Sequence, residues 1–372
     1  MWSVFKWFNY VRGDLGISSL TRRVPMSKMI SNQPSMKDVA KLAGVSLGTV
    51  SNVLNHPDIV RESTAKNVRR AIEQLGFVRN DAARQLKTGN SKAIGLIVPY
   101  SSNPFFAELA KGVESSAAEN GFQVLHGNSG HDKKRESGYL RMFQEQRLSG
   151  ILLSPVEDAT RNITQLRDLG TQLVIVDQKI SADLCCSVSV DDHYGGRLAA
   201  AHLIDQGRTR LAFVGGSLKI PQIADRLAGA RTAVIDSGSN IELRAIRAEG
   251  QDVISGRLVG MAILKMPVSE RPDGIFAAND LLAVGLLQAF AVSGLIDIPG
   301  EIAIIGYDDI DFAQSTVVPL SSIRQPAELL GSTALALLQD EISNPEHHKH
   351  QQVSFQPSLI VRASSLGKAT RS

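Results

Sequence analysis

The sequence predicts two structural classes in one chain, an N-terminal all-α domain of the helix-turn-helix type and a larger α/β domain built on parallel sheets. Short helices with apolar periodicity around a glycine turn, near residues 36–55, predict the first. From residue 93 onward, apolar strand runs alternate with amphipathic helices, a pattern typical of parallel strands with helical crossovers. A chain of 372 residues with 43% hydrophobic content is long enough for both domains.

Charge is distributed unevenly along the chain. The formal net charge is +3, but residues 36–92 carry ten Lys/Arg and five Asp/Glu, and residues 1–35 carry five basic residues and one acidic residue. The remainder is therefore acidic. A basic front on an acidic body indicates a domain that binds a polyanion such as DNA. No apolar run reaches eighteen residues, so no membrane partner is expected.

Residues 1–33 are expected to be a disordered extension or a start-site artefact. The segment contains Trp2 and Trp7 but has neither a continuous apolar region nor a small-residue cleavage site, which argues against a signal peptide. Met26, Met29 and Met36 follow closely, so translation could begin further along. A segment that binds a membrane surface or a partner is the alternative.

Residues 34–79 are expected to form the helix-turn-helix domain. Ser35 and Asp38 have capping-box spacing, and Gly44 stands where a chain leaving a helix needs positive φ. Ser46 is expected to cap a second helix over 47–54, and a third helix is expected over about 63–75. The apolar positions expected on the buried face of the first helix are Val39, Ala40, Leu42 and Ala43. Those expected to face outward from the second are Leu47, Gly48, Ser51 and Asn52.

The run from Asp38 to Asn55, D-V-A-x-x-A-G-V-S-x-x-T-V-S-x-V-L-N, resembles the signature of the lactose-repressor (LacI/GalR) family. The resemblance extends over residues 36–362 and implies a repressor that binds double-stranded operator DNA as a homodimer, with the second helix in the major groove. It also implies contacts to base edges by Leu47, Gly48 and Asn52. The residues that it implies in phosphate contacts or in holding the fold are Ser46, Thr49, Ser51 and Asn55.

Two positions in the head depart from the family pattern. Many members carry arginine where this chain has Asn52. Arginine suits guanine, whereas asparagine pairs bidentately with adenine, so a preference for an A·T pair is expected there. Arg61 stands where the family often has a serine that caps the third helix, and Ser63 or Thr64 is expected to take over that role.

Residues 80–91 are expected to form a hinge between the two domains. Its helix-forming part, residues 80–87, is shorter than the roughly 12 residues at which isolated helices become even marginally stable. The resemblance implies that it folds when two copies pair on DNA, with Leu86 wedged into the minor groove and Lys87 near phosphates. A plain linker helix is the alternative.

The body, residues 92–362, is expected to bind a small molecule at the carboxyl ends of its strands. The polar and aromatic residues expected at these ends are Asn103, Phe105, Phe106, Asp177, Arg226, Asn279 and Asp308. Carboxylates, an amide, a guanidinium and aromatic rings together suit a polyol or a nucleoside. The resemblance implies ligand contacts by Arg226, Asn279 and Asp308. It also places Gln251 where some relatives have an aromatic residue that stacks on the ligand.

The resemblance further implies a two-lobed, periplasmic-binding-protein-like body with three crossovers and the effector in the interlobe cleft. Lobe one is expected over about 92–190 and 325–353, and lobe two over about 191–322 and 356–362. Residues 363–372 are expected to be a tail without the leucine heptads that tetramerise some relatives, so a dimer is expected. Whether the effector induces or corepresses stays open.

Three alternatives to a repressor are an enzyme, a periplasmic receptor and a DNA-binding protein without effector control. The chain has no phosphate loop, dinucleotide fingerprint, nucleophile elbow or spaced metal motif, so no enzyme, cofactor or metal is expected. Cys185 and Cys186 are expected to be free thiols. His347, His348 and His350 could suggest a metal site, but a solvated turn after Pro345 is expected instead. A periplasmic receptor would need an export signal and no DNA-binding head. A cytoplasmic, nucleoid-associated bacterial repressor is expected, and its effector could be a sugar, a sugar phosphate or a nucleoside. DNA binding without effector control is the third alternative.

Overall fold

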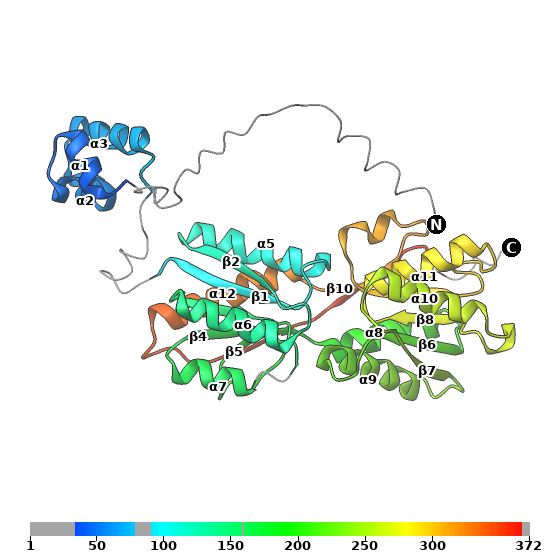
Figure 1. Cartoon of the computed structure of the whole chain (residues 1–372). Helices are drawn as coiled ribbons and strands as arrows, with labels where there is room; N and C mark the ends of the chain where they lie inside the picture. Colours follow the sequence, from blue (N-terminus) through cyan, green and yellow to red (C-terminus); the bar gives the residue numbers. More distant parts are fainter. Residues whose placement is uncertain (1–33, 79–90, 158–159, 367–372) are drawn as a thin grey trace, which may run out of the picture. The chain divides into compact units, whose positions relative to one another are not determined.

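The computed structural model describes residues 34–78, 91–157 and 160–366, and the chain divides into two units between residues 88 and 89 (Figure 1). The extension expected over 1–33 and the hinge residues Leu86 and Lys87 lie outside the described residues. Among the described residues, no helix is both long and apolar enough to cross a membrane.

The first unit is helical, as predicted. Its elements are α1 (Met36–Ala43), α2 (Leu47–Asn55), a short 3-10 turn (Pro57–Ile59) and α3 (Glu62–Leu75). Its core contains Val39 from α1, Val50 from α2 and Val68 from α3, all fully buried. The predicted capping box is present, because Ser35 N donates to Asp38 Oδ2 at 2.8 Å and Ser35 Oγ accepts from Asp38 N.

Two details of the first unit differ from the predictions. Leu42 is 50% exposed, because α1 turns its apolar stripe inward through Val39 and Ala40 and Leu42 falls at the border of that stripe. Helix α3 begins at Glu62, and the N-cap Arg61 makes no side-chain cap hydrogen bond. The Arg61 carbonyl already accepts from Thr64 N and Ala65 N, so Ser63 and Thr64 lie inside the first turn, too late to cap the helix.

The second unit consists of two lobes, each with one six-stranded sheet (Figure 1). The strand orders are β11-β5-β4-β3-β1-β2 in lobe one and β12-β10-β9-β8-β6-β7 in lobe two. Within the described residues, the chain passes between the lobes at β5 to α8, at β10 to α12 and at β11 to β12. This is the predicted two-lobed architecture with three crossovers.

Lobe one packs helices on both faces of its sheet. Its elements are β1 (Ala93–Val98), α5 (Pro104–Glu119), β2 (Gln123–Asn128), α6 (Lys133–Glu145), β3 (Gly150–Leu153), α7 (Thr160–Asp168), β4 (Gln172–Val176), β5 (Cys186–Val190), α12 (Ala327–Ser343) and β11 (Gln352–Phe355). Successive strand residues point to opposite faces. Accordingly, Leu96 of β1 packs in the core that contains residues of α5 and α12, and Ile97 packs in the core that contains residues of α6 and α7.

Lobe two repeats this arrangement with a single exception to parallel pairing. Its elements are α8 (Asp192–Asp205), β6 (Arg210–Gly215), α9 (Pro221–Asp236), β7 (Glu242–Arg247), α10 (Val253–Leu264), a 3-10 turn (Val268–Glu270), β8 (Gly274–Ala277), α11 (Asp280–Ser293), β9 (Ala303–Asp308), a 3-10 turn (Asp311–Ser315), β10 (Ser321–Arg324) and β12 (Ser358–Ile360). Strand β12 pairs antiparallel with β10. The chain enters β12 straight from the third crossover, and no helix carries it back to the other end of the sheet.

The C-terminal segment stays packed on lobe two beyond the expected boundary at residue 362. Ser364 and Ser365 are fully buried. Ser364 Oγ accepts from Ser321 N at 2.8 Å and donates to the Ile304 carbonyl at 2.7 Å. These bonds satisfy backbone groups beside β10 and β9, so the described chain up to Ser365 belongs to the lobe rather than to a tail.

Candidate ligand cleft and nucleic-acid interface

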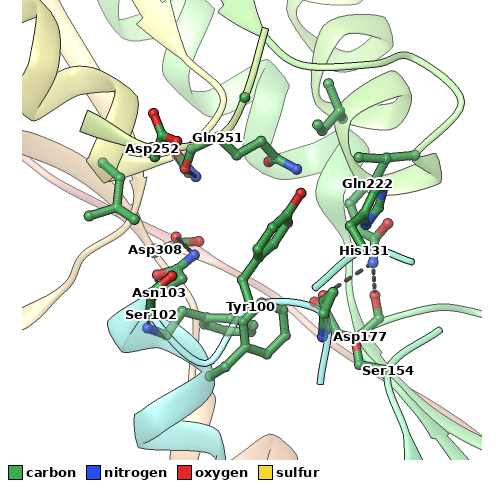
Figure 2. Close-up of a pocket in the computed structure, with 18 of the residues that line it drawn as sticks. Tyr100, Ser102, Asn103, His131, Ser154, Asp177, Gln222, Gln251, Asp252 and Asp308 are labelled. Atoms are coloured by element: carbon green, nitrogen blue, oxygen red, sulfur yellow. Dashed lines mark hydrogen bonds between the residues drawn. The ribbon is translucent and has the colours of Figure 1, made fainter. Parts of the chain in front are cut away.

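A cavity of about 260 Å³ lies between the two lobes (Figure 2). It is lined by all eight residues that the sequence singled out for ligand binding. They are Asn103, Phe105, Phe106, Asp177, Arg226, Gln251, Asn279 and Asp308. The carboxyl ends of parallel strands meet at one edge of a sheet. The two sheets place these edges opposite each other, so residues from β1 to β9 meet in one place.

The cavity also contains residues that the sequence analysis missed. They include Tyr100, Ser102, His131, Ser154, Gln222, Asp252 and Gln325. Tyr100 and Ser154 follow β1 and β3, so the same strand-end rule could have found them. His131 and Gln222 carry no comparable signal, because they precede helices α6 and α9 or begin them rather than ending strands.

Asp308, at the end of β9, is held from both lobes. Asn103 Nδ2 of lobe one donates to Asp308 Oδ2 at 3.1 Å, and Gln325 Nε2, at the second crossover, donates to Oδ1 at 2.8 Å. Its φ of 114° is a conformation that non-glycine residues seldom adopt, and such strain gathers at functional sites. Burial raises the pKa of Asp308 to about 6.

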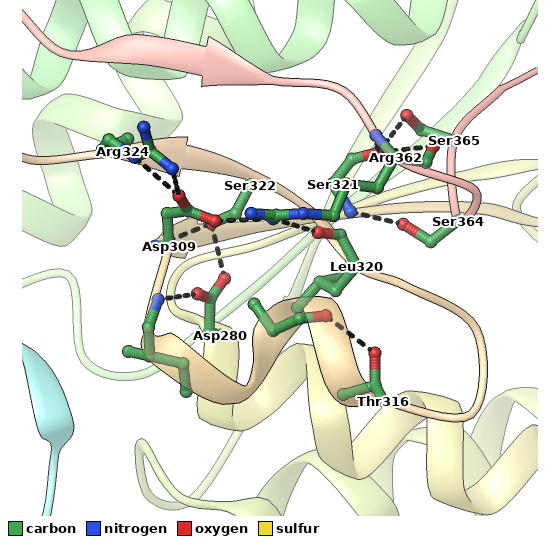
Figure 3. A network of polar contacts seen from close by, with 12 residues as sticks. Asp280, Asp309, Thr316, Leu320, Ser321, Ser322, Arg324, Arg362, Ser364 and Ser365 are labelled. Carbon is green, nitrogen blue, oxygen red and sulfur yellow. Dashed lines mark hydrogen bonds and ion pairs between the residues drawn. The ribbon is translucent and has the colours of Figure 1, made fainter.

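A polar network behind the cavity fixes the loop that carries Asp308 (Figure 3). Asp309 pairs with Arg324 and with Arg362, each at 2.6 Å. Asp280 accepts from Ser322 Oγ at 2.6 Å and from Ile310 N at 2.9 Å. Since both ends of the short loop are tied to lobe two, the strained backbone at Asp308 is imposed by its surroundings.

Asp177, at the end of β4, is the matching carboxyl group on lobe one. Gln222 Nε2 of lobe two donates to its carbonyl at 2.5 Å and to its Oδ2 at 3.1 Å (Figure 2). Its Oδ1 is buried without a hydrogen-bond partner among the described residues. Burial, reinforced by nearby Asp192, raises the pKa of Asp177 to about 8. Asp177 therefore carries its proton at neutral pH and can donate as well as accept.

Arg226 and Asn279 line the cavity and also make hydrogen bonds that stabilise the fold of lobe two. Arg226 Nε donates to Asp192 Oδ1 at 2.7 Å, Nη1 donates to the Ala278 carbonyl at 2.6 Å, and the guanidinium lies 3.6 Å over the Tyr307 ring. Asn279 caps α11 by accepting from Leu282 N. Only the remaining edge of Arg226 is left for a ligand.

The polar lining is acidic, and aromatic rings form part of the wall. Asp177, Asp252 and Asp308 face a single Lys/Arg side chain, Arg226, among the residues that line the cavity. The Tyr100 ring stacks on His131, with centroids 5.5 Å apart and planes at 12°. Burial lowers the pKa of His131, so this ring is neutral at pH 7. The cavity thus offers many hydrogen-bond acceptors and little positive charge.

In the first unit, α2 presents the expected surface. Ser46 caps the helix by accepting from Thr49 N at 3.0 Å, and Asn55 Nδ2 donates to the Ser51 carbonyl at 2.8 Å. These contacts support the fold. Leu47 is 46% exposed, and Gly48 and Asn52 are exposed as well. The Asn52 carbonyl accepts from His56 N at 2.7 Å within the helix, while its side-chain amide makes no hydrogen bond to the described residues and so is available to a base edge.

Comparisons with known proteins agree with both parts of the molecule. Residues 35–80 match the model of bacterial regulatory proteins of the lacI family, and residues 200–365 match a periplasmic binding protein-like domain. The ribose operon repressor of Escherichia coli K12 is 35% identical over 334 residues, which cover 89% of this chain and 99% of that protein. The chain belongs to the LacI family.

Two further comparisons support this LacI-family assignment. The transcriptional repressor PurR of Aliivibrio fischeri MJ11 is 32% identical over 336 residues, 90% of this chain and 99% of that protein. The crystal structure of the lac repressor dimer bound to operator and an anti-inducer matches with a TM-score of 0.75 and 25% identity, covering 90% of this chain and 99% of that one. This LacI-family chain is a DNA-binding transcription regulator and not an enzyme.

Proposed function

We propose that the protein is a repressor that binds a palindromic operator as a dimer, and that a neutral monosaccharide in the interlobe cavity controls its affinity for DNA. Leu47, Gly48 and Asn52 would read base edges in each half-site, while Leu86 and Lys87 of the hinge would contact the operator centre. Such a protein acts at the nucleoid. The lac repressor relative, a dimer bound to operator, supports this mode of binding.

One observation carries the regulatory part of the proposal: residues that line the cavity also join the lobes. Asn103 of lobe one bonds Asp308 of lobe two, and Gln222 of lobe two bonds Asp177 of lobe one. A ligand that bonds these side chains must replace or reinforce the contacts between the lobes. It therefore binds the open and closed arrangements unequally, which is the condition for shifting an equilibrium between them.

The charge and size of the cavity favour a neutral sugar over a sugar phosphate. A phosphate would face the carboxylates of Asp252 and Asp308, and Arg226 already bonds Asp192. The volume of about 260 Å³ is just below the roughly 300–1,000 Å³ of common small-molecule sites, which suits one sugar ring. The name of the ribose operon repressor makes ribose the first sugar to test.

A ligand screen by thermal unfolding of the full chain tests the effector class. Pentoses, hexoses, their phosphates and nucleosides are compared at equal concentration. Binding stabilises by RT ln(1 + [L]/Kd), about 2.7 kcal/mol at a hundredfold excess over Kd. We expect a hit among the neutral sugars. A nucleoside or a phosphorylated sugar as the sole hit would contradict the proposed class, and no hit would favour regulation without a small molecule.

Two matched variants show whether a hit binds in the cavity. Asp252 caps α10 through Ser255 N at 2.7 Å, and asparagine caps helices equally well, so Asp252→Asn removes a cavity carboxylate and keeps the cap. Asp132→Asn makes the same change at the cap of α6, outside the cavity. We expect the first variant to lose the ligand-induced shift and the second to keep it. Equal behaviour of the two would contradict binding in this cavity.

DNA binding and dimerisation are tested separately from the ligand. Duplexes selected from a random pool by the full chain should contain two inverted half-sites, and sedimentation should report two chains per duplex. Selection of single half-sites by one chain would contradict the dimer, while leaving the ligand screen interpretable.

A further inference from the structure

The loop between α12 and β11 holds two histidines that are not solvated. The polar turn expected over His347, His348 and His350 is correct for His347, which is exposed. It is wrong for the others, since the side chain of His348 is only 2% exposed and that of His350 only 19%. The pairing of β11 with β5 causes this, because it draws the loop against lobe one beside Cys186.

Both imidazole rings are oriented by hydrogen bonds at Nδ1. His348 Nδ1 contacts Asp340 Oδ2 at 2.6 Å, and His350 Nδ1 contacts the Ala182 carbonyl at 3.1 Å. An acceptor at Nδ1 keeps the ring proton there, so the lone pair of each ring lies on Nε2. Metal-binding histidines show this same arrangement, a carboxylate or carbonyl behind the ring.

The Nε2 atoms face a carboxylate and a thiol. Glu341, in the last turn of α12, has Oε1 at 3.6 Å from His350 Nε2, and its Oε2 is buried with no hydrogen-bond partner among the described residues. Cys186 Sγ lies 3.2 Å from His348 Nε2. Zn–N and Zn–O bonds of about 2.1 Å and Zn–S bonds of about 2.3 Å place tetrahedral ligands roughly 3.4–3.6 Å apart. The separation between Glu341 and His350, 3.6 Å, falls within that range, and the separation between Cys186 and His348, 3.2 Å, is shorter.

Three of these residues form one compact set. One ligand atom from each of Glu341, His348 and His350 lies within 4.8 Å of the others. The nearby cation, Arg167, is directed elsewhere, because its Nη1 donates to the carbonyls of Asp183 and Leu184. Two imidazoles and a carboxylate suit a borderline divalent ion, and the adjacent thiol favours zinc over magnesium or calcium.

We propose that Glu341, His348 and His350 bind one Zn²⁺ ion at this edge of lobe one. The ion would join the end of α12 to the loop that leads into β11, between the second and third crossovers. It lies apart from the ligand cavity, and none of its three ligands lines that cavity. Its role is therefore to stabilise lobe one.

The test is a Zn²⁺ titration of the full chain, free of any affinity tag and stripped with a chelator, against a chromophoric competitor. We expect one Zn²⁺ per chain, a higher unfolding temperature with Zn²⁺ than with Mg²⁺, and visible d–d bands of tetrahedral Co²⁺ when cobalt replaces zinc. These readouts need no variant, so they do not depend on a mutant folding. Substoichiometric binding, or equal effects of Zn²⁺ and Mg²⁺, would overturn the proposal.

Variants then assign the ligands. Losing a group that only orients a ligand typically weakens metal binding by about 10–100-fold, and Asp340→Asn, which changes the carboxylate behind the His348 ring, should fall within that range. Glu341→Gln and His350→Ala should each weaken Zn²⁺ binding by more than that. His347→Ala changes the exposed histidine of the same loop and should bind like the original chain. If His347→Ala weakened binding as much as His350→Ala, the assigned ligand set would be wrong.

Discussion

Replacing Arg226 with methionine should destabilise the protein strongly, because it leaves a buried carboxylate without its partner. Arg226 and Asp192 are 2.7 Å apart, and both side chains are only 7% exposed. Breaking a buried pair from one side costs about 3–5 kcal/mol. At roughly 2–4 °C per kcal/mol for a unit of this size, the unfolding temperature should fall by about 10 °C.

The same two helices supply a control and a rescue. Arg197 and Asp236 also join α8 to α9, at 3.2 Å, but both side chains are 49% exposed, so Arg197→Met should cost less than about 1 kcal/mol. Adding Asp192→Asn to Arg226→Met removes the stranded charge and should recover much of the loss. Urea unfolding followed by circular dichroism measures all four proteins.

Either of two results would refute this reasoning about the buried pair. A loss below about 1 kcal/mol for Arg226→Met would mean that Asp192 is not stranded. Failure of the double variant to recover stability would mean that lost packing on Tyr307, rather than charge, dominates. If the prediction holds, lost ligand binding by an Arg226 variant cannot be attributed to a missing ligand contact, which is why Asp252→Asn is the better probe of the cavity.

Three further predictions concern pH, DNA specificity and packing. Since burial raises the pKa of Asp308 to about 6 and that of Asp177 to about 8, the ligand-free folded protein holds these protons to higher pH than the unfolded chain. Its free energy of unfolding, measured by urea titration, should therefore fall as pH rises from about 4 to 8. Asp177→Asn should remove the part of this fall at the higher pH values. An unchanged pH profile in that variant would contradict the raised pKa of Asp177. Asn52→Arg should change the selected base pair from A·T to G·C, by about 1–3 kcal/mol in competition binding, and retention of A·T would rule out a direct contact. A Cβ at Gly196 would lie 2.0 Å from the Arg226 carbonyl oxygen, so Gly196→Ala should push α8 away from α9. The expected loss of stability is about 1–3 kcal/mol, measured by thermal unfolding. An unchanged stability would mean that the two helices move apart without cost.

Local signals in the sequence were enough to predict the elements and the region of the site. The capping box at Ser35 and the positive-φ position of Gly44 act over a few residues, and both are present. Strand ends are local features too, and in a parallel sheet they share one edge. That rule alone brought Asn103, Asp177 and Asp308 into one prediction, and the structure places all three in one cavity.

Features that depend on side-chain contacts between distant segments were not predictable. Nothing in the sequence near Arg226 indicates that its guanidinium is committed to Asp192, 34 residues away. His131 and Gln222 enter the cavity from helix starts, without a pattern of their own. The antiparallel direction of β12 follows from the third crossover and not from its own residues.

The sequence by itself determined that a helix-turn-helix head precedes a two-lobed α/β body, because periodicity, caps and turns depend on neighbouring residues. Only the tertiary structure decided which side chains meet. Cys186 and His348 are 162 positions apart, and the register of β11 on β5 brings them to 3.2 Å. Distances of this kind depend on strand order, pairing register and chain crossovers. These bring together segments whose local sequences do not indicate that they will be neighbours.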